Sequence, residues 1–154
     1  MISTRKTIIM YILLVEEDHF YASMIMGFLK KAGFSNIKHI DNGVDCLLQV
    51  YEESTPDLVI MDSHLSRVNG VDVIQKLITH KPGMKILVLK PLTNGSKFVQ
   101  PNHHAIIDVI MKDDLVLDHI MPHIHIIHSE VVQRKKSRPV TNMLVNFKRF
   151  IFAP

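Results

Sequence analysis

Short apolar segments alternate with segments of helical periodicity along most of this chain, and this alternation constrains the fold more than any other feature. The apolar segments are bounded by turn residues or charges, and at this length they suit buried strands better than helices. They span residues 8–15, 36–40, 58–61, 85–89 and 106–111. Apolar residues recur at helical spacing over 20–31, 44–51, 71–78 and 115–127. Strands and helices that alternate in this way form parallel sheets.

The alternation predicts an α/β fold with a doubly wound, five-stranded parallel sheet and helices on both faces. We expect its strands in the order 2-1-3-4-5 that is known from flavodoxin-like folds. The weakest helical pattern is in 91–105, which contains two prolines and Asn94-Gly95. Pro122 lies within the last helical segment, where we expect a kink. We expect one domain over residues 1–132 and a basic and apolar tail over 133–154.

Composition places the chain among globular proteins. It has 154 residues, of which 47% are hydrophobic and 21% charged.

The single cysteine, Cys46, excludes an internal disulfide framework and suits a reducing cytoplasm. Cys46 lies among apolar residues at helical spacing, which predicts a place in the core. The apolar run at 8–15 is followed at once by acids, without a cleavage pattern, so we expect a strand and no targeting signal or membrane span. We therefore expect a cytoplasmic protein.

Charged residues follow three of the predicted strands. Glu16 and Glu17 follow the first, Asp62 ends the third, and Lys112 follows the fifth. Taken alone, Asp62 could simply cap a loop. In a 2-1-3-4-5 sheet, however, strands one and three are neighbours at the switch point, so their acids converge. Oxygen ligands suit Mg²⁺, and carboxylates, Mg²⁺ and a lysine together suit a phosphoryl group.

From about residue 8 to residue 132 the sequence resembles the response-regulator receiver domains of two-component signalling. The resemblance rests on paired acids after strand one, a turn before the second helix, the Asp-x-x-Leu-x-x-x-x-Gly phosphoacceptor motif and a lysine after strand five. The matching residues are Val15-Glu16-Glu17, Asn42-Gly43, Asp62 with Leu65 and Gly70, and Lys112.

The resemblance implies a role for each site residue. Asp62 would accept a phosphoryl group from a phosphohistidine of a sensor histidine kinase or phosphotransfer protein. Mg²⁺ would be bound by the side chains of Glu17 and Asp62 and by the backbone carbonyl of His64, with Glu16 assisting through water. Lys112 would pair with the phosphoryl oxygens.

The chain also departs from the family pattern at five positions. Glu17 is one methylene longer than the usual Asp, and Ser66 replaces a proline, which we expect to loosen that loop. Lys90 replaces the small hydroxyl residue that ends strand four, and Val109 replaces the aromatic switch residue of strand five. Asp113 stands where a proline usually follows the family lysine. The acceptor is thus retained, while both residues usually coupled to the output switch are lost.

Lys90 has two interpretations. As lysines generally do, it could point to solvent. If it pointed inward, it would compete with Mg²⁺, since two unit charges about 4 Å apart interact by about 4 kcal/mol at an effective dielectric of about 20.

The preferred hypothesis is a stand-alone receiver, not an enzyme, that is phosphorylated on Asp62 and signals through protein–protein association, with a homodimer as one form. Two alternatives stay open: a degenerate pseudo-receiver that binds partners without phosphorylation, and a regulator whose basic tail contacts DNA. The tail has a basic part, 134–138, and an apolar part, 143–152, which its own domain or a dimer partner would cover. His119 and His123, four residues apart, could bind zinc, but solvated histidines fit this helix better.

Overall fold

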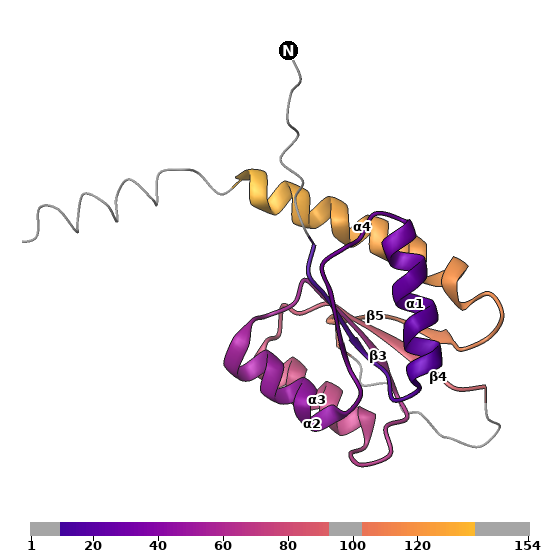
Figure 1. Cartoon of the computed structure of the whole chain (residues 1–154). Coiled ribbons are helices and arrows are strands. Elements are labelled where there is room, and N and C mark those ends of the chain that lie inside the picture. The colour runs from indigo at the N-terminus through magenta and orange to yellow at the C-terminus, as the bar shows by residue number, and fades with distance from the viewer. Residues whose placement is uncertain (1–9, 93–102, 138–154) are drawn as a thin grey trace, which may run out of the picture.

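The structure is a computed structural model that describes residues 10–92 and 103–137 (Figure 1). Its core is a five-stranded sheet in the order β2-β1-β3-β4-β5, and every neighbouring pair of strands is parallel. The predicted sheet and strand order are therefore confirmed. The strands are β1 (Ile12–Val15), β2 (Ile37–Ile40), β3 (Leu58–Asp62), β4 (Ile86–Lys90) and β5 (Ile106–Met111).

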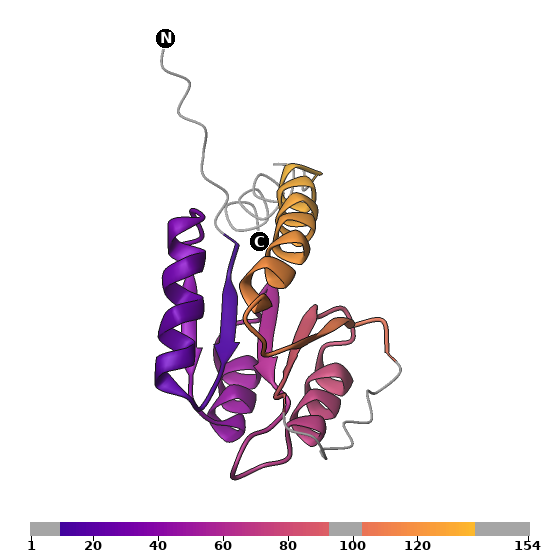
Figure 2. The ribbon, with the colours of Figure 1, turned by 90° about the vertical axis from the view of Figure 1, so that its right-hand side faces the viewer.

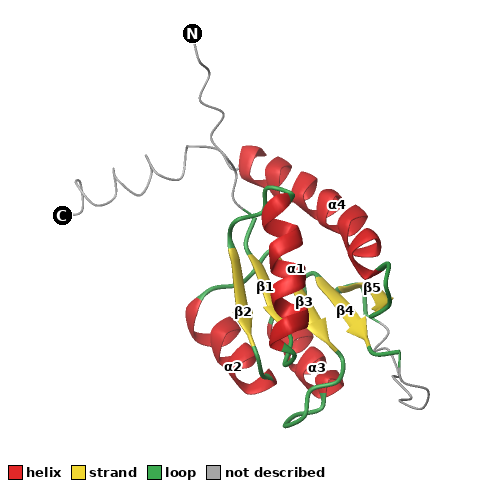
Figure 3. Cartoon of the chain, turned by 45° about the vertical axis from the view of Figure 1, so that its right-hand side comes forward, coloured by secondary structure: helices red, strands yellow, loops and turns green. Residues whose placement is uncertain are grey.

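Helices cover both faces of the sheet, as a doubly wound fold requires. They are α1 (His19–Lys31), α2 (Gly43–Leu48), α3 (Gly70–His80) and α4 (Val116–Ser137). Helices α1 and α4 lie on one face, and α2 and α3 lie on the other (Figure 3). In Figure 1, α1 and α4 lie to the upper right of the strands and α2 and α3 to the lower left, and Figure 2 shows the same elements turned by 90°. No helix in residues 10–92 and 103–137 is long and apolar enough to cross a membrane.

Side-chain alternation along the strands divides the core into two apolar clusters. In β3, Leu58 and Ile60 pack with α1 and α4, whereas Val59 and Met61 pack with α2 and α3. All five residues of β3 are buried, and each fully buried aliphatic side chain contributes about 1.5–3 kcal/mol of transfer free energy. Because successive side chains point to opposite faces, Asp62 belongs to the α1/α4 face.

Several element boundaries differ from the prediction. β1 begins at Ile12, and residues 1–9 lie outside the described part of the chain. The weak helix expected in 91–105 falls largely on residues 93–102, also outside it, and 103–105 are not helical. After α2 the chain continues as a π-helical turn, η1 (Gln49–Glu53), in which the Ser54 N–H donates to the Gln49 carbonyl over 3.3 Å.

Helix α4 is longer than expected. It passes through Pro122 as one helix and, within the described residues, reaches Ser137, beyond the expected domain end at residue 132. Arg134 in its last turn pairs with the Asp57 carboxylate, which also accepts the Tyr11 N–H over 2.9 Å. One basic residue assigned to the tail, Arg134, thus contacts the edge of the sheet where the strands begin. The apolar part of the tail lies outside the described residues, so its cover stays a prediction.

Arg134→Ala is expected to lower the free energy of unfolding by about 1 kcal/mol, the upper end for a partly exposed ion pair. The Asp57 side chain is only 13% exposed and would keep one hydrogen-bond partner, the Tyr11 N–H. Urea unfolding of the full chain measures the change. Lys136→Ala is the matched control within the same basic segment, and an equal loss in both variants would contradict a specific role for Arg134.

Cys46 fills the core as predicted. Its side chain is fully buried against the α2/α3 face, and burial raises the pKa of the thiol to about 12. A thiol with this pKa stays protonated at neutral pH and is a poor nucleophile.

Candidate functional site

Three charged residues expected at the carboxyl edge of the sheet come together there. Adjacent strands β1 and β3 pair in parallel register, with Val15 beside Met61, so Glu16 and Asp62 end up side by side. The Lys112 Nζ lies 2.8 Å from Glu16 Oε2 and 2.8 Å from Asp62 Oδ2. Glu16 is 1% exposed and Asp62 4%. We call Glu16, Asp62 and Lys112 the charged triad.

Backbone groups hold the other two carboxylate oxygens of the charged triad. Glu16 Oε1 accepts the Asp18 N–H over 3.0 Å, and Asp62 Oδ1 accepts the His64 N–H over 2.7 Å. The next residue after Asp62, Ser63, donates its N–H to the Leu89 carbonyl over 2.8 Å. Both acids are therefore oriented from two sides, which is the fixed geometry that a reacting carboxylate needs.

The environment sets the charge of the triad. Burial raises the pKa of Glu16, and the hydrogen bond from Lys112 opposes this rise. Burial lowers the pKa of Lys112, but its hydrogen bonds to Asp62 and Glu16 outweigh burial, and the pKa is raised above the ordinary lysine value. Lys112 is consequently a permanent cation at neutral pH. With both carboxylates ionised, the triad carries one net negative charge.

Tyr21 completes the surroundings of Lys112 and was not identified from the sequence. The ammonium lies 4.2 Å from the centroid of the Tyr21 ring, a cation–π distance. Burial raises the pKa of Tyr21 to about 12, and within the described chain its buried hydroxyl has no hydrogen-bond partner. Phe20 begins the apolar helical pattern over 20–31, but in the structure Phe20 is 83% exposed. The buried face of α1 is formed by Ala22, Ile25 and Leu29, and Tyr21 packs against the same cluster.

Glu17 lies apart from the charged triad. Its Oε1 accepts two hydrogen bonds from Ser66, one from the backbone N–H over 2.7 Å and one from Oγ over 3.0 Å. The expectation that Ser66 loosens the loop between β3 and α3 is therefore wrong, because this residue ties the loop to the end of β1.

Lys90 and Val109 occupy the positions where the family pattern is broken. Lys90 is two residues beyond Val88, which packs on the α2/α3 face, so alternation places it on the face opposite Asp62. Among the described residues it forms no ion pair with the triad; Lys112 supplies that charge. Val109 packs at the margin of the α2/α3 cluster. Neither position carries the hydroxyl or aromatic group usual in the family.

The donor chemistry of this edge suits Mg²⁺, whereas the present placement of its acids suits it less. Glu16, Asp62 and the His64 carbonyl are oxygen donors, as a hard cation prefers. With Glu17 held by Ser66, however, no group of three or more His, Cys, Asp or Glu side chains in the described chain is placed to bind a metal ion. The same finding covers His119 and His123; His123 instead pairs with Asp108 over 3.0 Å.

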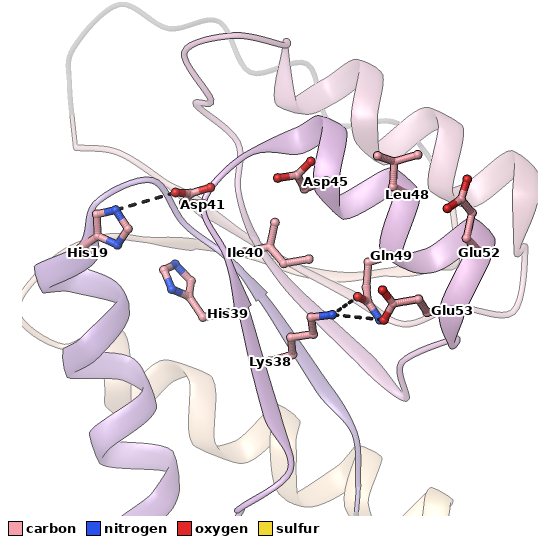
Figure 4. Close-up of a pocket in the computed structure, with 10 residues that line it drawn as sticks. All are labelled: His19, Lys38, His39, Ile40, Asp41, Asp45, Leu48, Gln49, Glu52 and Glu53. Atoms are coloured by element: carbon pink, nitrogen blue, oxygen red, sulfur yellow. Dashed lines mark hydrogen bonds and ion pairs between the residues drawn. The ribbon is translucent and has the colours of Figure 1, made fainter.

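A cavity of about 520 Å³ lies beside the edge strand β2 (Figure 4). Its walls come from α1, β2, α2 and η1, and none of the charged triad lines it. One wall residue, His39, contacts the site through its ring Nε2, 2.8 Å from the backbone carbonyl of Glu16. The cavity adjoins the triad without being part of it.

Comparison with known proteins identifies the family. The sequence model of the response regulator receiver domain matches residues 12–120, so this chain belongs to the receiver-domain family of two-component signalling. The chain is 27% identical over 101 residues to the chemotaxis protein CheY of Thermotoga maritima, a match that covers 66% of this chain and 83% of that protein.

Other relatives are longer proteins, and solved structures share the fold. A putative transcriptional regulator of Pseudomonas aeruginosa is 34% identical over 77 residues, covering 49% of this chain and 37% of the regulator. The signal receiver domain of a putative LuxO repressor protein from Vibrio parahaemolyticus superposes with a TM-score of 0.68 at 18% identity, covering 85% of this chain and 98% of that chain. A CheY-like receiver domain protein from Methanospirillum hungatei superposes with a TM-score of 0.66 at 19% identity, covering 83% of this chain and 98% of that chain.

Proposed function

We propose that this receiver domain accepts a phosphoryl group on Asp62 from a phosphohistidine of a sensor histidine kinase or phosphotransfer protein. The observation that carries the proposal is the charged triad: a buried, backbone-oriented carboxylate whose Oδ2 lies 2.8 Å from a permanent cation. Phosphoryl transfer depends mainly on positioning and charge neutralisation, and the triad supplies both.

The transfer is a displacement at phosphorus. An Asp62 oxygen forms the new oxygen–phosphorus bond as the phosphorus–nitrogen bond to the donor imidazole breaks, and the imidazole leaves with its electron pair. Lys112 already contacts Asp62 and neutralises charge on the phosphoryl oxygens without a large movement. Tyr21 and Glu16 keep its ammonium at this edge.

Mg²⁺ would be held by Asp62, Glu16 and the His64 carbonyl, and by Glu17 once it has left Ser66. When bound, the ion supplies positive charge beside the phosphoryl group. The protein's own residues orient the acceptor and keep Lys112 protonated.

The output of the domain would be altered protein–protein association and not catalysis. Lys90 and Val109 remove the hydroxyl and aromatic groups that usually couple the acceptor to a distant surface, so we expect the signal to pass through the loops next to Asp62. A phosphorylation-independent receiver is the second candidate, favoured by one observation: Lys112 engages both buried acids at 2.8 Å and so satisfies them without a phosphoryl group.

Asp62→Asn is expected to abolish phosphorylation, because an amide cannot act as the acceptor. The chain is incubated with acetyl phosphate and Mg²⁺, and its intact mass is measured. The parent chain should gain one phosphoryl group and the Asp62→Asn variant none. Asp57→Asn is the matched control, because Asp57 directly precedes the other end of β3. This variant should gain one phosphoryl group like the parent chain. Absence of label on the parent chain at saturating Mg²⁺ would favour the phosphorylation-independent receiver.

A further inference from the structure

The link between Glu17 and Ser66 joins two residues 49 positions apart in the chain. A single carboxylate oxygen of Glu17 accepts both the Ser66 N–H and the Ser66 hydroxyl, at 2.7 and 3.0 Å. Hydrogen bonds to a charged acceptor are stronger than neutral ones. The link fixes which way this half-buried acid points, and that direction is toward the β3–α3 loop.

Both residues depart from the pattern of the family, and the link needs both departures. A proline at position 66 has neither a backbone N–H nor a hydroxyl, so it could donate neither bond. An aspartate at position 17 would be one methylene shorter and would reach less far from the end of β1. The two changes therefore act as one interaction and not as two separate losses.

The loop holds its end of the link in a fixed position. The Ser63 N–H bonds to the Leu89 carbonyl over 2.8 Å, Leu65 is buried, and Gly70 lies against the Ser63 backbone. Ser66 is exposed between these anchors. Its donors are consequently presented to Glu17 by a loop that is anchored on both sides.

We propose that Glu17 and Ser66 form a latch that withholds the Glu17 carboxylate from the charged triad, so that a divalent cation binds only in competition with the latch. This inference rests on the proposed function for its cation site and adds a regulatory element to it. With the latch closed, one net negative charge at the triad faces the cation; with Glu17 released, there are two.

Ser66→Pro is expected to tighten Mg²⁺ binding by about tenfold, the factor that separates a carboxylate available about one-tenth of the time from one that is always available. Isothermal titration calorimetry of the full chain with MgCl₂ measures the dissociation constant. Ser66→Ala keeps the N–H and should give a smaller gain. Because a proline also alters the loop backbone, Glu17→Asp is a second test and should tighten binding too.

The gain must pass through Glu17. The double variant Glu17→Gln with Ser66→Pro should therefore bind Mg²⁺ more weakly than Ser66→Pro alone. Unchanged affinity in both Ser66→Pro and Glu17→Asp, with each variant folded by circular dichroism, would overturn the latch.

Amide hydrogen exchange gives a readout that does not depend on phosphorylation. The Ser66 N–H should exchange slowly in the parent chain, faster in Glu17→Gln, and faster in the parent chain once Mg²⁺ is added. If the exchange rate of the Ser66 amide changed neither in Glu17→Gln nor on addition of Mg²⁺, the latch would be contradicted even if Asp62 is phosphorylated. Conversely, the expected exchange behaviour in a chain that acetyl phosphate does not label would support the latch and refute the proposed function.

Discussion

Lys112→Met should lower the free energy of unfolding by about 3 kcal/mol at neutral pH, because removing one partner of a buried ion pair leaves uncompensated charge. Glu16 and Asp62 are nearly fully buried, and Glu16 Oε2 and Asp62 Oδ2 each accept a hydrogen bond from the Lys112 ammonium. Methionine matches the apolar stem of lysine and lacks only the terminal ammonium. The loss is therefore electrostatic and not a matter of packing.

The loss in Lys112→Met should depend on pH in a defined direction. Without the lysine, burial and repulsion by Asp62 both raise the pKa of Glu16 in the folded protein above its value in the unfolded chain. A group with a raised folded-state pKa contributes stability below its unfolded pKa and loses that contribution as pH rises through the folded pKa. The variant should therefore recover stability on acidification toward pH 5 and be weakest above neutrality.

Urea unfolding of both chains between pH 5 and pH 8 measures this dependence. Adding Glu16→Gln to Lys112→Met should restore part of the lost stability, since one buried charge is then removed. The single variant should also be labelled by acetyl phosphate roughly 100-fold more slowly, as expected when one fixed charge-stabilising donor is removed. A pH-independent loss of stability would show that the triad is not an electrostatic unit.

Gly70→Ala is expected to destabilise the fold by about 2–3 kcal/mol, the upper range for overpacking. A Cβ on Gly70 would lie 2.5 Å from the Ser63 carbonyl oxygen and 2.8 Å from its carbon. These are backbone atoms next to Asp62, so they cannot move aside as a side-chain end would. This close approach explains why glycine suits position 70 of this chain.

Urea unfolding again measures the loss, and Gly27→Ala is its matched control. Gly27 lies within α1, and a Cβ there would meet no atom within 4 Å. Alanine is favoured over glycine in a helix, so Gly27→Ala should stabilise the protein by about 0.5–1 kcal/mol. If Gly70→Ala were as harmless as Gly27→Ala, the loop from Ser63 to Gly70 would be less tightly packed than described.

Much of the fold and the triad follows from the sequence for a physical reason. Short apolar runs between helical segments leave few solutions other than a parallel sheet, and the strand order brings the ends of β1 and β3 together. The convergence of Glu16 and Asp62 follows from that order, and the long side chain of Lys112 reaches both acids from the end of β5, past β4.

The features that were not predicted depend on where individual side chains point and how far they reach, which a pattern along the sequence does not show. The helical spacing did not decide whether Phe20 or Tyr21 faces the sheet, because both residues are aromatic. The choice matters, since a shift of one residue turns a helix by about 100°. Ser66 looked like a loss of rigidity because proline stiffens loops, and its partner Glu17 is far away in the sequence. The continuation of α4 as far as Ser137 was not predicted, because basic residues are common both in the last turns of helices and in tails.

The most direct test of the central claim is to locate the phosphoryl group chemically. After incubation with acetyl phosphate and Mg²⁺, borohydride reduces an aspartyl phosphate to homoserine, which peptide mass spectrometry detects. Phosphorylation on Asp62 predicts homoserine at position 62 and unchanged aspartate at positions 57 and 72. Homoserine at another acid, or aspartate at position 62 in a chain whose intact mass has increased by one phosphoryl group, would contradict it.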